Sequence, residues 1–247
     1  MSNQLTTTTP DEQKPVFSFA SFTLLILFVF LATLATAVLL PLWLPGLTTS
    51  LSGEAPKAFW YLSRGSAIIA YLLLWLSMML GTGITNKLGS LWPGLPSTIE
   101  MHEYVSILGL AFGLFHGLFL LGDQFIGFNL AQILVPFTAS YQTLAVGLGQ
   151  TAFYIWILLD ISFYVRKTIG KKAWRAIHFT SFLTFLSVLV HALLAGTDAL
   201  SPIMQYLYLG TGGLLVFMVL YRILAALARK KEKRLIPQAI PPKLPVS

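Results

Sequence analysis

The sequence predicts an all-α membrane protein, a bundle of six transmembrane helices. The chain has 247 residues, of which 56% are hydrophobic and only 10% are charged, whereas soluble domains carry about 25% charged residues. Its mean hydropathy is +0.76. Its apolar residues gather in six stretches of about 20 residues, the length that crosses a bilayer as a helix. A soluble globule, a disordered chain and a nucleic-acid-binding domain are excluded on these grounds.

Each span is defined by its lack of charge. No charged residue occurs between Pro15 and Gly53, so the first span covers 16–42 and ends beside prolines. We expect this span to be retained and not cleaved, because its apolar stretch is longer than that of a signal peptide. The other five spans are predicted at 59–80, 98–121, 143–165, 173–194 and 203–227.

Little of the chain lies outside these spans. A polar N-terminal segment, 1–15, precedes the six-span domain, 16–227, and a basic, proline-rich tail, 228–247, follows it. The connection 122–142 contains several phenylalanines, and we expect it to cap the outer surface of the bundle.

The lysines and arginines set the orientation. If both termini are cytoplasmic, every lysine and arginine except Lys57 and Arg64 belongs to the cytoplasmic side. Cytoplasmic loops are enriched in these residues, so the sequence predicts this orientation. The net charge of +7 then reflects topology and not nucleic-acid binding. The expected location is the cell membrane, as a multi-pass protein whose first partner is the lipid bilayer.

All four histidines lie in the third and fifth spans, as His102, His116, His178 and His191. Ionisable side chains inside spans are costly and mark functional sites. Both spans run outward, so His102 and His178 lie near the inner face and the other two near the outer face. At about 1.5 Å per residue, the two levels are roughly 20 Å apart. The sequence predicts two layers, each with one imidazole from each helix.

Each layer suits a haem iron, which accepts two axial ligands on opposite faces and binds neutral imidazole. The chain has no cysteine, which excludes an iron–sulfur cluster and a covalently attached c-type haem. Two imidazoles alone leave a zinc ion underligated. We therefore predict two b-type haems, with His102 and His178 on the inner iron and His116 and His191 on the outer iron. Histidines that only pack or carry protons are the alternative.

The spacing of the histidines agrees with this arrangement only in part. At about 100° per residue, the fourteen residues from His102 to His116 return to within roughly 40° of one face. The thirteen residues from His178 to His191 miss by about 140°. A local bend, which Thr180 and nearby hydroxyl residues favour, or differently turned haems would remove the discrepancy.

Two arginines are candidates for holding haem propionates. Arg64 lies near the outer start of the second span, where an arginine is costly without a counter-charge. It either binds outer propionates or extends to the interface beside Trp60. Arg175 precedes His178 by three residues and either binds inner propionates or serves only the topology.

The spans that carry these residues resemble the ferric reductase-like transmembrane domain. That superfamily includes NADPH oxidases, ferric reductases, STEAP metalloreductases and the haem subunit of the bacterial methionine sulfoxide reductase system. The resemblance covers about 60–198 and rests on the segments YLSRGSAIIAYLLLWLSMMLG, HEYVSILGLAFGLFH and WRAIHFTSFLTFLSVLVHALLAGTD. It implies an oxidoreductase component that passes electrons from a cytoplasmic donor through two b-type haems to an outer acceptor. NADPH oxidases have the same fourteen- and thirteen-residue spacing.

The chain departs from the family at its C-terminal side. NADPH oxidases and ferric reductases continue into FAD- and NADPH-binding domains, whereas this chain ends about twenty residues after the sixth span. We therefore expect a separate cytoplasmic flavin reductase or quinol as the donor. A quinol-oxidising or metal-reducing enzyme that acts alone is the second interpretation, and a non-haem transporter or assembly factor is the third.

Overall fold

The computed structural model describes residues 14–43, 58–86, 94–123 and 126–235, and within these ranges all regular structure is helical. Six helical segments of the described chain are long and apolar enough to cross a membrane. The predicted all-α class and the predicted number of spans are therefore confirmed, and the chain has the build of a multi-pass membrane protein.

The spans begin and end near the predicted residues. They are α1 (Phe19–Trp43), α3 (Ala58–Thr85), α4 (Leu95–Phe119), α6 (Thr143–Ile169), α7 (Lys171–Phe179) with α8 (Ser181–Ala195), and α9 (Pro202–Leu235). The predicted fifth span is thus two helices that meet at Thr180. Helix α9 continues past the predicted end at 227, so the first part of the predicted tail is helical.

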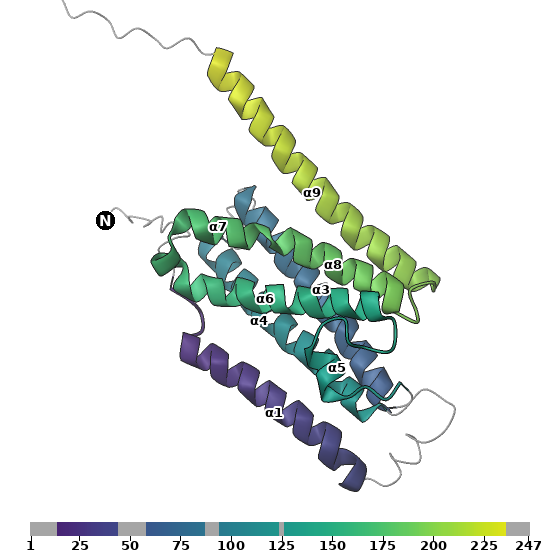
Figure 1. Ribbon diagram of the computed structural model, residues 1–247. Helices are drawn as coiled ribbons and strands as arrows, with labels where there is room; N and C mark the ends of the chain where they lie inside the picture. The colour runs from purple at the N-terminus through teal and green to yellow at the C-terminus, as the bar shows by residue number, and fades with distance from the viewer. Residues whose placement is uncertain (1–13, 44–57, 87–93, 124–125, 236–247) are drawn as a thin grey trace, which may run out of the picture.

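Helices α3, α4, α6 and α8 form the centre of the bundle, with α1 along one side and α9 along the other (Figure 1). Helices α1, α4 and α7 begin, and α3 and α6 end, toward the left and upper end of the bundle, and α9 runs past this end toward the top of the picture (Figure 1). Apolar side chains from several helices form the core. Its buried members include Phe22, Tyr71, Leu74, Ile107, Leu110, Trp156, Phe185 and Leu215.

Polar contacts attach the two outer helices. The Tyr71 hydroxyl lies 2.5 Å from Oγ1 of Thr211, and Nε1 of Trp75 donates to the Thr211 carbonyl at 3.1 Å, which fixes α9 against α3. The Glu103 carboxylate accepts the Val16 amide at 3.0 and 3.1 Å, which ties the start of α1 to α4. Each bond satisfies a polar group at a point where a helix joins the bundle.

The connection between α4 and α6 is folded against the bundle. It contains a 3-10 turn, η2 (Leu120–Gly122), and a short helix, α5 (Leu130–Leu134). Nε2 of Gln150 donates to the carbonyls of Gln132 and Ile133 at 2.6 and 2.7 Å. The Tyr154 hydroxyl also donates to the Leu134 carbonyl. These bonds from α6 hold α5 across one end of the bundle, as expected of a cap.

The small residues on α4 make room for α6. A Cβ atom added at Gly109 would lie 2.8 Å from the Trp156 ring, and one at Gly113 would lie 3.3 Å from the Phe153 ring. Both rings belong to α6, so these glycines serve close packing between α4 and α6.

Candidate functional site

The four histidines form two pairs, each with one ring from α4 and one from the α7–α8 segment. The ring centres of His102 and His178 are 6.0 Å apart, with 83° between the ring planes. The ring centres of His116 and His191 are 6.2 Å apart, with 65° between the planes. The structure therefore brings together the partners that the sequence assigned to the same layer.

The spacing within each pair matches two imidazoles on opposite sides of one metal ion. A metal–imidazole bond is about 2 Å long, and an imidazole nitrogen lies about 1.1 Å from its ring centre given ordinary ring bond lengths. Two such bonds in line separate the ring centres by roughly 6 Å. The observed 6.0 and 6.2 Å fit that arrangement.

The interruption at Thr180 lies between the two histidines of the fifth span. The Thr180 amide donates to the Ile177 carbonyl, three residues back, at 2.9 Å, and its hydroxyl donates to the same carbonyl at 2.7 Å. This tighter turn departs from ideal α-helical geometry. Both His178 and His191 meet histidines of α4, although their thirteen-residue spacing would turn them apart on an ideal helix.

Hydrogen bonds orient both rings of the outer pair. Nδ1 of His116 lies 2.8 Å from the Ser63 carbonyl oxygen, and Nδ1 of His191 lies 2.8 Å from the Ala145 carbonyl oxygen. Because a carbonyl only accepts, each Nδ1 carries the hydrogen and each Nε2 keeps its lone pair. This tautomer is the one in which a histidine uses Nε2 as a metal ligand.

The inner pair is held by α3 and by a tryptophan. Nδ1 of His102 lies 3.1 Å from the Ser77 hydroxyl. His178 stacks on Trp174, one turn earlier on α7, with 5.2 Å between the ring centres. The Trp174 indole nitrogen is buried and has no hydrogen-bond partner among the described residues. It is a donor that an anionic substituent of a bound group would satisfy.

Glycines on two neighbouring helices give room to one imidazole of each pair. A Cβ atom added at Gly81 of α3 would lie 3.2 Å from Cε1 of His102. One added at Gly149 of α6 would lie 2.7 Å from Nδ1 of His191. The His191 ring therefore lies directly against the α6 backbone, where only glycine leaves space for it.

A cavity of about 420 Å³ opens beside the outer pair. His116 and His191 both line it, together with Gly113, Gly149 and Phe153. Pockets that take cofactors and other small molecules span roughly 300–1,000 Å³ and are mostly apolar. The imidazole spacing, the Nε2 lone pairs and this cavity together fit a haem.

The two arginines differ in their placement. Arg64 lines the cavity, forms an ion pair with Asp198, and lies 4.6 Å from the centre of the Trp60 ring. Arg175 is on α7, one turn before His178, and its side chain is exposed. Binding of propionates by either arginine remains a prediction.

Several residues of the site were not foreseen from the sequence. Ser63 and Ser77 on α3 are fourteen residues apart, as are His102 and His116 on α4. Because α3 and α4 are antiparallel, each serine reaches the histidine at its own level. The shared fourteen-residue spacing is the feature of the sequence from which the serine–histidine contacts could have been predicted. Asp198, the partner of Arg64, had no comparable signal because it lies far away in the sequence.

No protein-family model matches the chain, and no curated protein or solved structure is detectably similar to it. Among the described residues, no three or more histidine, aspartate or glutamate side chains gather into a group that could hold a metal ion.

Proposed function

We propose that the chain carries electrons across the cell membrane through two b-type haems, one at each histidine pair. The observation that carries the proposal is the pairing itself. Helix α4 and the α7–α8 segment supply one imidazole each at two levels, with ring centres 6.0 and 6.2 Å apart. The proposal agrees with the resemblance of the sequence to the ferric reductase-like transmembrane domain.

The haems would act as one-electron carriers. The chain would hold them in position and shield them from water. His102 and His178 would hold the inner iron, and His116 and His191 the outer iron. Carbonyls that accept from Nδ1, as at His116 and His191, raise the basicity of Nε2 and fix the plane of the ring.

The region between the two levels is packed with buried aromatic side chains. Phe185 of α8, between His178 and His191 in the sequence, stacks on Tyr71 of α3 with 5.8 Å between the ring centres. Both rings are almost completely buried. At about 1.5 Å per residue along α4, the two levels are roughly 20 Å apart. Phe185 and Tyr71 would exclude water from the space between the two carriers.

The electron donor is expected at the end of the bundle where α7 begins. Lys171 and Lys172 are exposed there, beside the helix that carries His178. By the positive-inside rule this end is cytoplasmic. A basic surface suits the anionic surface of a separate flavin reductase. Quinol that arrives through the bilayer is the other donor, and the acceptor would meet the outer level near His116 and His191.

Haem content and spectrum test the proposal. Purified full-length protein should contain close to two haems per chain by the pyridine haemochrome assay. Its reduced-minus-oxidised spectrum should show six-coordinate b-type haem. A haem content near zero would contradict the proposal and favour a transporter or assembly factor. A content near one would show that one level holds no haem.

A further inference from the structure

A polar cluster inside the bundle lies apart from both histidine pairs, between α4 and α6. Oδ1 of Asp160 accepts a hydrogen bond from the Ser106 hydroxyl at 2.8 Å, and Nε1 of Trp156 donates to the Ser106 oxygen at 3.1 Å. The second carboxylate oxygen, Oδ2 of Asp160, is buried and has no partner among the described residues. One turn later on α6, the buried hydroxyl of Tyr164 also has no partner among them.

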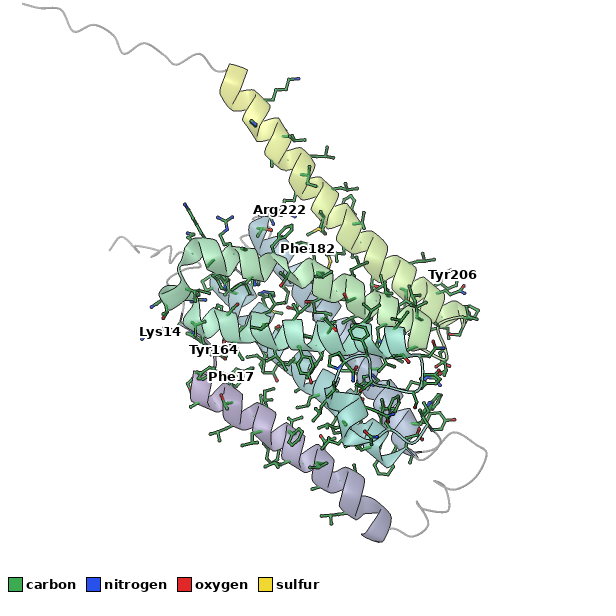
Figure 2. The ribbon with its side chains drawn as sticks, in the orientation of Figure 1. Lys14, Phe17, Tyr164, Phe182, Tyr206 and Arg222 are labelled. Carbon is green, nitrogen blue, oxygen red and sulfur yellow. The ribbon has the colours of Figure 1, made fainter. Side chains whose placement is uncertain are left out.

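The first turns of α1 cover this cluster with apolar rings. The Tyr164 ring lies 5.4 Å from the ring centre of Phe19 and 5.5 Å from that of Phe22. Figure 2 shows Phe17 and Tyr164 close together, at the end of the bundle where Lys14 lies. Helix α1 contains no ionisable side chain. No charge from α1 therefore compensates a negative charge on Asp160.

The ionisable groups that act directly on Asp160 and Tyr164 are carboxyl groups. Glu103 of α4 interacts electrostatically with Asp160, and both carboxyl groups interact with Tyr164. Arg166 of α6 is the cation that acts on Glu103. The other acidic, basic and histidine residues of α6 and of the segments packed on it are Lys167 of α6, Glu100, His102 and His116 of α4, His191 of α8, and Lys171, Lys172, Arg175 and His178 of α7.

An ionised Asp160 would carry its charge on an oxygen with no donor in a medium of low dielectric constant. Burial of a carboxylate without full pairing is strongly unfavourable, and a nearby second carboxylate adds repulsion. A proton on Oδ2 removes both penalties, and the positive charge of an oxidised metal centre at the inner pair would offset them until reduction removes that charge. The hydrogen-bonded partner of the other oxygen, Ser106, lies one turn beyond His102 on α4. The cluster therefore lies about one helical turn along α4 from the level of the inner pair.

We infer that Asp160 is a proton-binding site inside the membrane, and that it takes up a proton when the inner histidine pair's site receives an electron. The coupling rests on the proposed function, whereas the proton site itself does not. One added electron lowers the charge of the metal centre by one. One proton from the aqueous phase then binds Oδ2 and converts the carboxylate to a neutral carboxylic acid. The proton leaves when the electron moves on, so charge balances at both steps.

Infrared difference spectroscopy of the full-length protein tests the inference directly. Reduction should produce the carbonyl stretch of a protonated carboxyl group, and this band should shift in heavy water. Asp160→Asn should abolish the band. Asp123→Asn is the matched control, because Asp123 is also a buried aspartate with one unpartnered oxygen but follows η2 at the far end of α4. A band that persists in Asp160→Asn, or that is lost in Asp123→Asn instead, overturns the inference.

Potentiometry separates this inference from the proposed function. The midpoint potential of the inner haem should fall by up to about 59 mV per tenfold decrease in proton concentration, and Asp160→Asn should flatten that slope. An unchanged slope in Asp160→Asn, with two haems still bound, overturns the coupled proton uptake and leaves the electron-transfer proposal standing.

Two further measurements apply if the protein binds no haem or if Asp160→Asn does not fold. If the purified chain holds no haem, the proposed function fails. The carboxyl band of Asp160 should then still titrate with pH in the haem-free protein, and its absence overturns the proton site as well. If Asp160→Asn does not fold, Ser106→Ala removes the donor to Oδ1 and should shift the frequency of the band. An unshifted band in Ser106→Ala counts against Asp160 as its source.

Discussion

Three of the four imidazoles are held by a neighbouring helix, and the fourth is held by its own helix. His116 and His102 bond to serines of α3, His191 bonds to a carbonyl of α6, and His178 stacks on its own helix. Side chains fixed in this way lose little conformational entropy when they bind a metal ion. The contact of His191 with Gly149 is the tightest of these, because a Cβ atom there would lie 2.7 Å from Nδ1.

Gly149→Ala should displace the His191 ring and weaken the outer haem. Crowding by one methyl group in a well-packed site costs about 1–3 kcal/mol, so the outer haem should bind roughly 10- to 100-fold more weakly, as for other changes around a metal ligand. Haem titration of the purified variant, read from the difference spectrum, measures this loss.

Gly213→Ala is the matched control, since a Cβ atom at that position of α9 meets nothing within 4 Å. Alanine is also the better helix former by about 1 kcal/mol. The control should keep both haems. Equal haem loss in the two variants would show that Gly149 has no special role.

At the scale of elements, the fifth span shows what a single sequence reveals. Its long apolar stretch predicted a transmembrane segment, and the spacing of His178 and His191 left open either a bend in the helix or differently turned haems. The structure places that departure at Thr180. Long apolar segments can be predicted from the sequence because their period and length are local properties of the chain.

Contacts between helices could not be predicted from the sequence in the same way. The hydrogen bonds of Ser63 and Ser77 to histidines depend on the axial register of α3 against α4. The bond of the Ala145 carbonyl to His191 depends on the register of α6 against α8. The ion pair of Arg64 with Asp198 depends on the relative depth of two distant segments. Sequence alone does not fix these registers, because many offsets bury a similar apolar area.

Thr180→Ala should straighten the α7–α8 junction and disturb the inner pair. The change removes the hydroxyl that donates to the Ile177 carbonyl and adds a residue that favours continuous helix. The inner haem should then bind more weakly or show an altered ligand field, while the outer haem stays unchanged. Electron paramagnetic resonance of the oxidised protein detects the two haems separately.

Ser187→Ala, on α8 away from the junction, serves as control. An unaltered inner signal in Thr180→Ala would mean that the break does not position His178.

Across the whole molecule, electron transfer from one side of the membrane to the other requires the two histidine levels to face opposite sides. The natural chain has no cysteine, so single introduced cysteines report on exposure without background. Leu200, 85% exposed, lies in the connection between α8 and α9. Lys172 lies at the other end of the bundle, in the first turn of α7 (Figure 1).

In cells, a thiol reagent that does not cross membranes should label Leu200→Cys directly and Lys172→Cys only after permeabilisation. The excess of lysine and arginine at the Lys172 end favours a cytoplasmic location for that end. Labelling in the reverse order would invert the direction of electron flow that we propose.

The basic end of the molecule should also govern the encounter with a soluble donor. Replacement of Lys171 and Lys172 by glutamine should slow haem reduction by a cytoplasmic flavin reductase several-fold at low ionic strength, with haem content unchanged. The difference should vanish near 1 M salt, where electrostatic interactions reach only about 3 Å. Stopped-flow absorption measures these rates. Reduction that depends on neither the substitutions nor the salt would indicate quinol as the donor.

The haem content of paired histidine variants tests whether each haem is held by one histidine of α4 and one histidine of the α7–α8 segment. If His102 and His178 hold one haem and His116 and His191 the other, each single alanine variant loses one haem of two. The double variant His102→Ala/His178→Ala should then still keep one haem, because both changes remove the same site. The double variant His102→Ala/His116→Ala should keep none. The opposite pattern, with one haem kept when both histidines of α4 are lost and none kept when His102 and His178 are lost, would contradict the pairing.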